Sequence, residues 1–354
     1  MSFLRDLKEE IKDVKRDQEF VLRCRITEDQ YQMLEAIKTR DNNKFKHLMT
    51  RGVDPNFFND TGSTPLHIVS GLKQTSGNLA VKDILQVLVY FGTSLDSVDR
   101  FGQTPLHIAC HTSASTVQVL LETGAAVDVQ DNAGHTPLME TCSSDCPEAL
   151  SIVQYLLDHN CNISLRDQEG HTALHCICGN LKQDMTLRNE IALQLLYRGL
   201  SANVEDKTGK MAMCYELNHF LHRKKPLSDK GLQLVQTLIK AGSTFNRKNR
   251  QHDRYVRYAC KVSSGPMFTQ LAELLAPVLS VGGVLALRDC VPKEDEDHTH
   301  FHQYLSSLAC RVQPLKLMCR TALREAPELR GKLYTKVNLL PIPSTLKDYM
   351  VLVE

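Results

Sequence analysis

The sequence lacks tryptophan, net charge and any long apolar run. The absence of tryptophan excludes nothing by itself. The 42 basic and 41 acidic side chains nearly cancel, so no overall electrostatic field would draw the chain to nucleic acid or an anionic membrane. The longest apolar run, residues 274–287, is too short to span a bilayer and is interrupted by Pro277. The first residues turn charged at Arg5, unlike a secretory signal. We therefore expect neither a nucleic-acid partner nor a membrane partner.

The twelve cysteines show no spacing typical of a disulfide framework. Several stand in apolar, helix-like contexts, where cysteine acts as a small hydrophobic residue: Cys110, Cys142, Cys176, Cys178 and Cys214. We expect reduced thiols and a cytoplasmic protein. The basic string HRKKP at residues 222–226 leaves the nucleus as an alternative, although a polar insertion is the preferred interpretation.

An internal repeat is the strongest pattern in the chain. Related strings begin at four threonines, each two residues after a glycine: TPLHIV at Thr64, TPLHIA at Thr104, TPLMET at Thr136 and TALHCI at Thr172. A degenerate version, KMAMCY, follows Gly209. The successive glycines are 40, 32, 36 and 39 residues apart. These spacings bracket a unit of about 33 residues with insertions.

The chemistry of one repeat predicts a pair of helices. Thr104 can cap a helix whose first residue is Pro105, where a missing N–H costs nothing. A second helix follows, with an apolar face formed by Val117, Leu120 and Leu121. Gly124 suits the left-handed position that ends it. Because no pair can bury its own apolar faces, neighbouring pairs should stack, with residues 99–102 and 131–134 as hairpin fingers between them.

The pattern resembles the ankyrin repeat. The resemblance implies an all-α solenoid of about six repeats over residues 29–285, with a first copy at 29–60, a degenerate copy at 208–247 and a capping pair at 250–285. Two long gaps predict loops near residues 71–80 and 179–188. Residues 1–28, with apolar side chains at helical spacing, are expected to form a charged helix or cap.

The tail resembles a SOCS box, a small three-helix unit, at residues 304–354 after an acidic and histidine-rich linker at 286–303. Its first motif, at residues 314–323, matches the elongin-binding BC box through Pro314, Leu315, Cys319 and Leu323. Its second matches the cullin-5 box through Leu340, Pro341, Ile342 and Pro343. The resemblance implies an elongin B/C heterodimer and cullin-5 with its RING partner as binding partners.

The side-chain pattern of the tail agrees with this reading. Leu315, Cys319 and Leu323 lie at i, i+4 and i+8, a narrow stripe that suits a groove on another protein. The LPIP string at residues 340–343 cannot continue a helix, because its prolines lack an N–H. The alternative is that these stripes form only the core of a small helical cap.

Together the two resemblances place the chain with ankyrin-repeat and SOCS-box proteins. They imply a non-catalytic adaptor that holds an unidentified target protein for ubiquitination; the alternative is an ankyrin scaffold that acts without the ubiquitin system. Target contacts are expected at finger tips and on the concave helix face. By repeat position, the candidates are Phe58, Arg100, Phe101, Arg166 and Lys207.

The sequence contains only weak signals for catalysis, metal binding or RNA binding. We predict no cofactor, no metal and no catalytic residue. Cys176 beside His175 suggests a thiol hydrolase, but both stand at a repeat helix start. Alternating histidines at 298–302 could suggest a metal site, yet nothing completes a four-ligand set, so a solvated linker is preferred. The basic stretch at 246–261 could suggest RNA or a phosphorylated partner, but a solvated finger of the last repeat is preferred.

Overall fold

The computed structural model describes residues 26–73, 80–180, 182–222, 229–241 and 243. In these residues it contains helices and no β-strand, apart from an isolated antiparallel bridge between Glu205 and Met211. No helix in this part of the chain is both long and apolar enough to cross a membrane. The chain divides into two compact units, of which unit 1 ends at Cys161 and unit 2 begins at Asn162.

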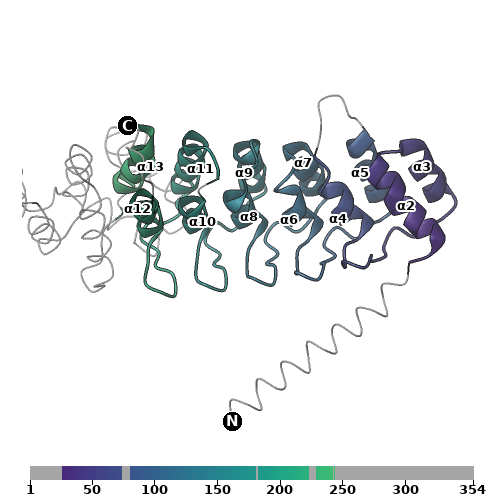
Figure 1. The fold of residues 1–354 in the computed structure, drawn as a ribbon, viewed down its shortest axis with the longest axis horizontal. Coiled ribbons are helices and arrows are strands. Elements are labelled where there is room, and N and C mark those ends of the chain that lie inside the picture. The colour runs from purple at the N-terminus through teal and green to yellow at the C-terminus, as the bar shows by residue number, and fades with distance from the viewer. Residues whose placement is uncertain (1–25, 74–79, 181, 223–228, 242, 244–354) are drawn as a thin grey trace, which may run out of the picture. The chain divides into compact units, whose positions relative to one another are not determined.

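The described residues of unit 1 form helix pairs in two rows (Figure 1). One row contains α2, α4, α6 and α8, and the other contains their partners α3, α5, α7 and α9, with contacts along each row and within each pair. The bounds are α2 Glu28–Thr39, α3 Asn42–Thr50, α4 Pro65–Ser70, α5 Ala80–Tyr90, α6 Pro105–Ala109, α7 Ala114–Glu122, α8 Pro137–Ser143 and α9 Ala149–Asp158.

Unit 2 repeats the arrangement with two described pairs. Helices α10 and α12 pack on each other, as do their partners α11 and α13. The bounds are α10 Ala173–Gly179, α11 Met185–Tyr197, α12 Ala212–His222 and α13 Asp229–Lys240. The degenerate string KMAMCY therefore still starts a helix, α12.

Four of the described first helices begin at the threonines that the sequence predicts. Thr64, Thr104, Thr136 and Thr172 are the N-cap residues of α4, α6, α8 and α10, with extended backbone. The hydroxyl oxygen of Thr64, for example, accepts the His67 N–H, which satisfies one of the amide groups that a helix start leaves unpaired. Proline holds the first position of α4, α6 and α8.

The two predicted loops differ in outcome. Residues 71–73, after α4, lie outside any helix, as expected, and the rest of the predicted loop up to residue 79 lies outside the described residues. The prediction of a loop through residue 188 was wrong, because α11 begins at Met185. Asp184 ends the loop early: its carboxylate accepts the Thr186 N–H at 3.0 Å and caps the helix.

Burial follows the predicted stripes. Val117, Leu120 and Leu121 of α7 are buried, and Gly124 ends that helix with a φ of +97°. In the fingers, Gly102 has a φ of +76°, and a Cβ there would lie 2.8 Å from the Asn132 backbone nitrogen of the next finger. The fingers therefore approach each other closely only because the turn residue has no side chain.

Candidate interaction surface

Three histidines join the first helix of a pair to the finger that follows. In unit 1, the His67 Nδ1 accepts the backbone N–H of Thr64 at 3.2 Å, so its Nε2 carries the proton and donates to the Gln103 carbonyl at 2.9 Å. His107 makes the same pair of bonds to Thr104 and His135. In unit 2, His175 makes them to Thr172 and Lys210. Each imidazole thus fixes the position of the next finger.

Burial keeps these histidines neutral. It lowers the pKa of His67, His107 and His175, in the last case to about 4, although the hydrogen bonds to the finger carbonyls act in the opposite direction. A neutral ring is also what the bonding requires, because Nδ1 must accept a hydrogen. The fingers are therefore held in place by groups that lose this geometry when protonated.

His175 should make the folded protein less stable as the pH is lowered. Below pH 6.5 the unfolded chain protonates this residue, whereas the folded chain does not until about pH 4, so stability decreases as the pH falls between these values. We expect wild type to lose about 2–3 kcal/mol more than His175→Gln between pH 6.5 and 4.5, measured by urea unfolding. His47→Gln, at an exposed site in α3, should behave as wild type. Equal slopes for wild type and His175→Gln would contradict the prediction.

The third clear copy of the repeat departs from this pattern. Met139 replaces the histidine, and the next residue, Glu140, is 9% exposed. Its carboxylate contacts His111 Nε2 at 2.6 Å and His135 Nδ1 at 3.0 Å. Burial alone would raise the pKa of Glu140, but the two imidazoles outweigh it and lower the pKa to about 2. The site therefore holds a buried carboxylate anion.

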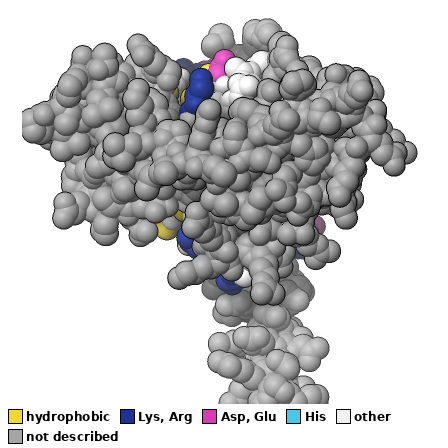
Figure 2. Space-filling model, turned by 90° about the vertical axis from the view of Figure 1, so that its left-hand side faces the viewer, with side chains coloured by type: hydrophobic (Ala, Val, Ile, Leu, Met, Phe, Trp, Pro, Cys, Tyr) yellow, Lys and Arg dark blue, Asp and Glu magenta, His cyan; other side chains and the backbone are white. Residues whose placement is uncertain are grey.

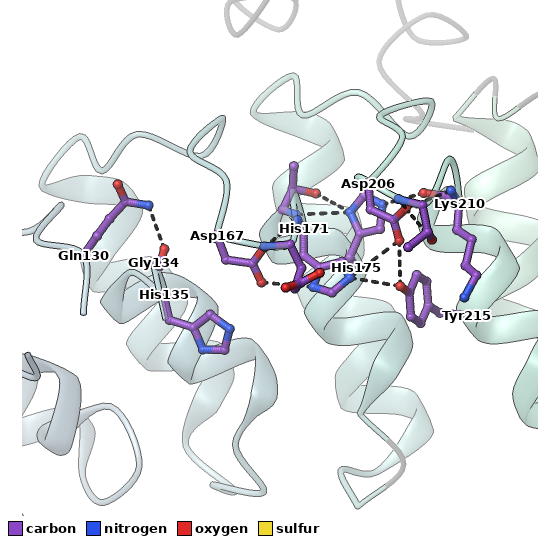
Figure 3. A network of polar contacts seen from close by, with 12 residues as sticks. Gln130, Gly134, His135, Asp167, His171, His175, Asp206, Lys210 and Tyr215 are labelled. Atoms are coloured by element: carbon purple, nitrogen blue, oxygen red, sulfur yellow. Dashed lines mark hydrogen bonds and ion pairs between the residues drawn. The ribbon is translucent and has the colours of Figure 1, made fainter. Parts of the chain in front are cut away.

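Unit 2 carries a polar chain along its fingers (Figure 3). His171 lies between Asp167, whose Oδ2 is 3.0 Å from His171 Nδ1, and Tyr215, whose hydroxyl is 2.9 Å from His171 Nε2. The Tyr215 hydroxyl also donates to Asp206 at 2.7 Å. The hydroxyl has one hydrogen, which it donates to Asp206, so its oxygen is the acceptor toward His171 Nε2. The chain joins successive fingers through charge-assisted bonds.

The largest fully buried side chain of the described residues is that of Arg188, in α11. Its guanidinium donates to the Ile177 carbonyl at 3.0 Å, to the Cys178 carbonyl at 3.3 Å and to the Glu216 carboxylate in α12. Both members of the ion pair are 1% exposed. The pair connects α11 and α12 to the end of α10, and it has no counterpart in the predicted pattern of apolar stripes.

The family comparison agrees with this geometry of paired helices, threonine caps and glycine fingers. It finds ankyrin repeats in three copies, over residues 33–131, 74–167 and 115–208. The chain contains ankyrin repeats. Ankyrin repeat proteins are typically non-catalytic scaffolds that bind other proteins, so protein partners in general follow from the match. The matched residues end before the tail.

The local chemistry of the ankyrin repeats disfavours a thiol hydrolase. Both ring nitrogens of His175 are engaged, by Thr172 and by the Lys210 carbonyl, so the ring is not positioned as a base for Cys176. Burial raises the pKa of Cys110 to about 12 and that of Cys214 to about 11. These thiols stay protonated near neutral pH and act as small apolar residues.

The predicted target-binding residues of unit 1 have different environments. Phe101 is 62% exposed at a finger tip, whereas Phe58 in the preceding finger is partly buried. The exposed Arg100 side chain turns back to that preceding finger, where it donates to the Thr61 carbonyl at 3.0 Å and to the Asp60 carbonyl. Phe101 is thus the member of this set with the clearest opportunity to contact a partner.

Arg166 and Lys207, the predicted residues of unit 2, are both exposed on fingers. Arg166 donates to the Glu205 carbonyl at 3.1 Å, and the backbone N–H of Lys207 donates to the Glu169 carbonyl at 2.9 Å. Each residue therefore also contributes to the contacts between neighbouring fingers. The Lys207 side chain remains a candidate for an acidic group on a target.

Sequence reasoning missed an exposed aromatic pair at the end of α5. Tyr90 is 84% exposed and Phe91 44%, and their rings meet edge-to-face at 5.5 Å. The only signal in the sequence is two aromatics directly before Gly92, where a core stripe has already ended.

On the face in Figure 2, few described side chains are visible, and they include basic, acidic and hydrophobic ones.

The tail residues predicted to bind the ligase lie outside the described residues. These are Pro314, Leu315, Cys319 and Leu323 of the BC box and Leu340, Pro341, Ile342 and Pro343 of the cullin-5 box. The linker at 286–303, with its alternating histidines, the basic stretch at 246–261 and the predicted capping pair at 250–285 lie there too.

Proposed function

We propose that the chain is the substrate-recognition adaptor of an elongin B/C–cullin-5–RING ubiquitin ligase. The observation that carries the proposal is the pair of tail motifs, about twenty residues apart, in the order of a SOCS box and behind ankyrin repeats. Either string alone arises easily by chance. Their combination and position are specific.

In this role the chain makes and breaks no covalent bond. The ankyrin fingers would hold a target protein, with Phe101 and Lys207 among the contacts, while the tail recruits the enzymes that carry ubiquitin. The effect on rate is one of proximity, because a target lysine is held near the ubiquitin thioester at high effective concentration. The rigid finger contacts described above support a surface that is already ordered before the target arrives.

A second candidate function is an ankyrin scaffold that binds proteins without the ubiquitin system. The ankyrin repeats alone favour it, because they imply protein partners in general and nothing about ubiquitin. Under this alternative the tail is a folded cap. Target binding and activity would then persist after the tail is removed.

The BC box gives the direct test. Leu315→Ala with Cys319→Ala removes two members of the stripe, and burial of a leucine side chain contributes about 1.5–3 kcal/mol. We expect calorimetry with purified elongin B/C to show affinity at least about tenfold weaker, since 1.4 kcal/mol corresponds to a factor of ten. The matched control is Lys316→Ala with Arg320→Ala, which has the same spacing one position along the chain. Unchanged affinity of the stripe variant would favour the scaffold.

A further inference from the structure

Three side chains that commonly ligate metals, those of Asp131, His135 and Glu140, meet in unit 1 beside a fourth, His111, and we call the four residues the His–Glu cluster. Glu140 lies in α8 and His135 directly precedes that helix; Asp131 starts the same finger and His111 follows α6. One ligand atom each from Asp131, His135 and Glu140 lie within 4.8 Å of one another. The second Glu140 oxygen is 2.6 Å from His111 Nε2.

The donor set has the composition of a transition-metal site. The imidazole of His135 and the carboxylates of Asp131 and Glu140 suit Zn²⁺ and similar ions, and together the two carboxylates would neutralise a divalent cation. Asp131 Oδ1 accepts the amide hydrogens of Ala133 and His135 at 2.9 and 2.8 Å, so its Oδ2 is the oxygen available to an ion. The same bonds fix the finger that carries His135.

The spacing of these atoms is close to that around a bound ion. Zinc bonds of 2.0–2.2 Å place tetrahedral ligands about 3.3 Å apart. The ligand atoms of Asp131, His135 and Glu140 lie within 4.8 Å of one another, so the three side chains would have to close by up to about 1.5 Å around an ion.

The cluster is not a consequence of the repeat pattern. The residue at the position of Glu140 is Ile68 in α4 and Ile108 in α6, both apolar. An acidic side chain that is 9% exposed must be compensated, and here two imidazoles from separate repeats meet it. The third copy has therefore exchanged an apolar position for a set of convergent ligands.

We propose that the His–Glu cluster binds a divalent transition-metal ion of the zinc class. The ion would join α8 to the finger at residues 131–135, while His111, after α6, would hold the second Glu140 oxygen and so orient this ligand from the preceding repeat. This site is independent of the ubiquitin role, because none of its ligands belongs to the tail motifs or to the target-binding candidates.

The test uses the full chain, stripped of metal with a chelator, in calorimetric titrations with Zn²⁺ and absorption titrations with Co²⁺. We expect wild type to bind one equivalent that His135→Gln with Glu140→Gln loses, or binds at least about tenfold more weakly. The matched control, Glu122→Gln with His159→Gln, changes the same residue types at exposed positions of unit 1 and should keep that equivalent. Zinc should also raise the unfolding temperature of wild type and of the control but not of the cluster variant.

Comparison of variants separates this site from other zinc ligands in the chain, such as the histidines of residues 298–302. If circular dichroism shows that the double variant is misfolded, His111→Gln provides the second variant, since the His111 side chain is 40% exposed and its loss should spare the fold. Equal zinc stoichiometry and affinity in wild type and the folded variants would overturn the proposal. So would a wild type that takes up no ion in a large excess of metal.

Discussion

Replacement of Arg188 by alanine should lower the free energy of unfolding of the α10–α13 region more than substitution of an exposed side chain does. The change leaves the Glu216 carboxylate, 1% exposed, without its cation, and loss of one partner from such a pair costs about 3–5 kcal/mol. We expect a free energy of unfolding lower by that amount, measured in urea on the full chain. The Ile177 and Cys178 carbonyls also lose their donor.

Two variants control for this result. Arg188→Met with Glu216→Leu removes both charges and keeps much of the volume, so it should recover most of the lost stability. Arg51→Ala breaks a pair with Asp29 in which both side chains are at least 41% exposed, and it should cost less than about 1 kcal/mol. If Arg188→Ala costs no more than Arg51→Ala, the buried pair is not needed for the stability of unit 2.

Replacement of Pro341 and Pro343 by alanine should abolish most ubiquitin transfer while elongin binding survives. The change restores two N–H groups and frees two backbone positions, so the LPIP strip loses the preorganisation that its docking requires. We expect cullin-5 association in pulldowns to fall sharply, and reconstituted transfer to fall with it. Target binding should persist, because the ankyrin surface is unchanged.

The comparison with elongin makes this result interpretable. Equal loss of elongin and cullin-5 would mean that the whole box had unfolded, and the assignment of LPIP would fail. Full cullin-5 binding and transfer would show that LPIP is only a structural turn. A matched control is Pro327→Ala, which changes a proline between the two motifs and should leave cullin-5 association nearly intact.

The order of helices could be read from the sequence because its causes are local. A threonine cap, a glycine two residues earlier and an apolar stripe each act within a few residues, and α4, α6, α8 and α10 begin as they predict, the first three with a proline after the threonine. The prediction for the second loop was wrong for an equally local reason. Asp184 caps α11 earlier than the gap between repeats implies.

The sequence by itself thus determined the repeat, its ankyrin identity and the starts of α4, α6, α8 and α10, and it supplies the tail motifs on which the proposed function depends. Only the tertiary structure decided which polar side chains meet across repeats. Glu140 contacts His111, 29 residues earlier in the sequence, and Arg188 contacts Glu216, 28 residues later. The periodic pattern marks these positions as ordinary helix residues, because it records how apolar faces recur and not which charged groups the stacked helices bring together.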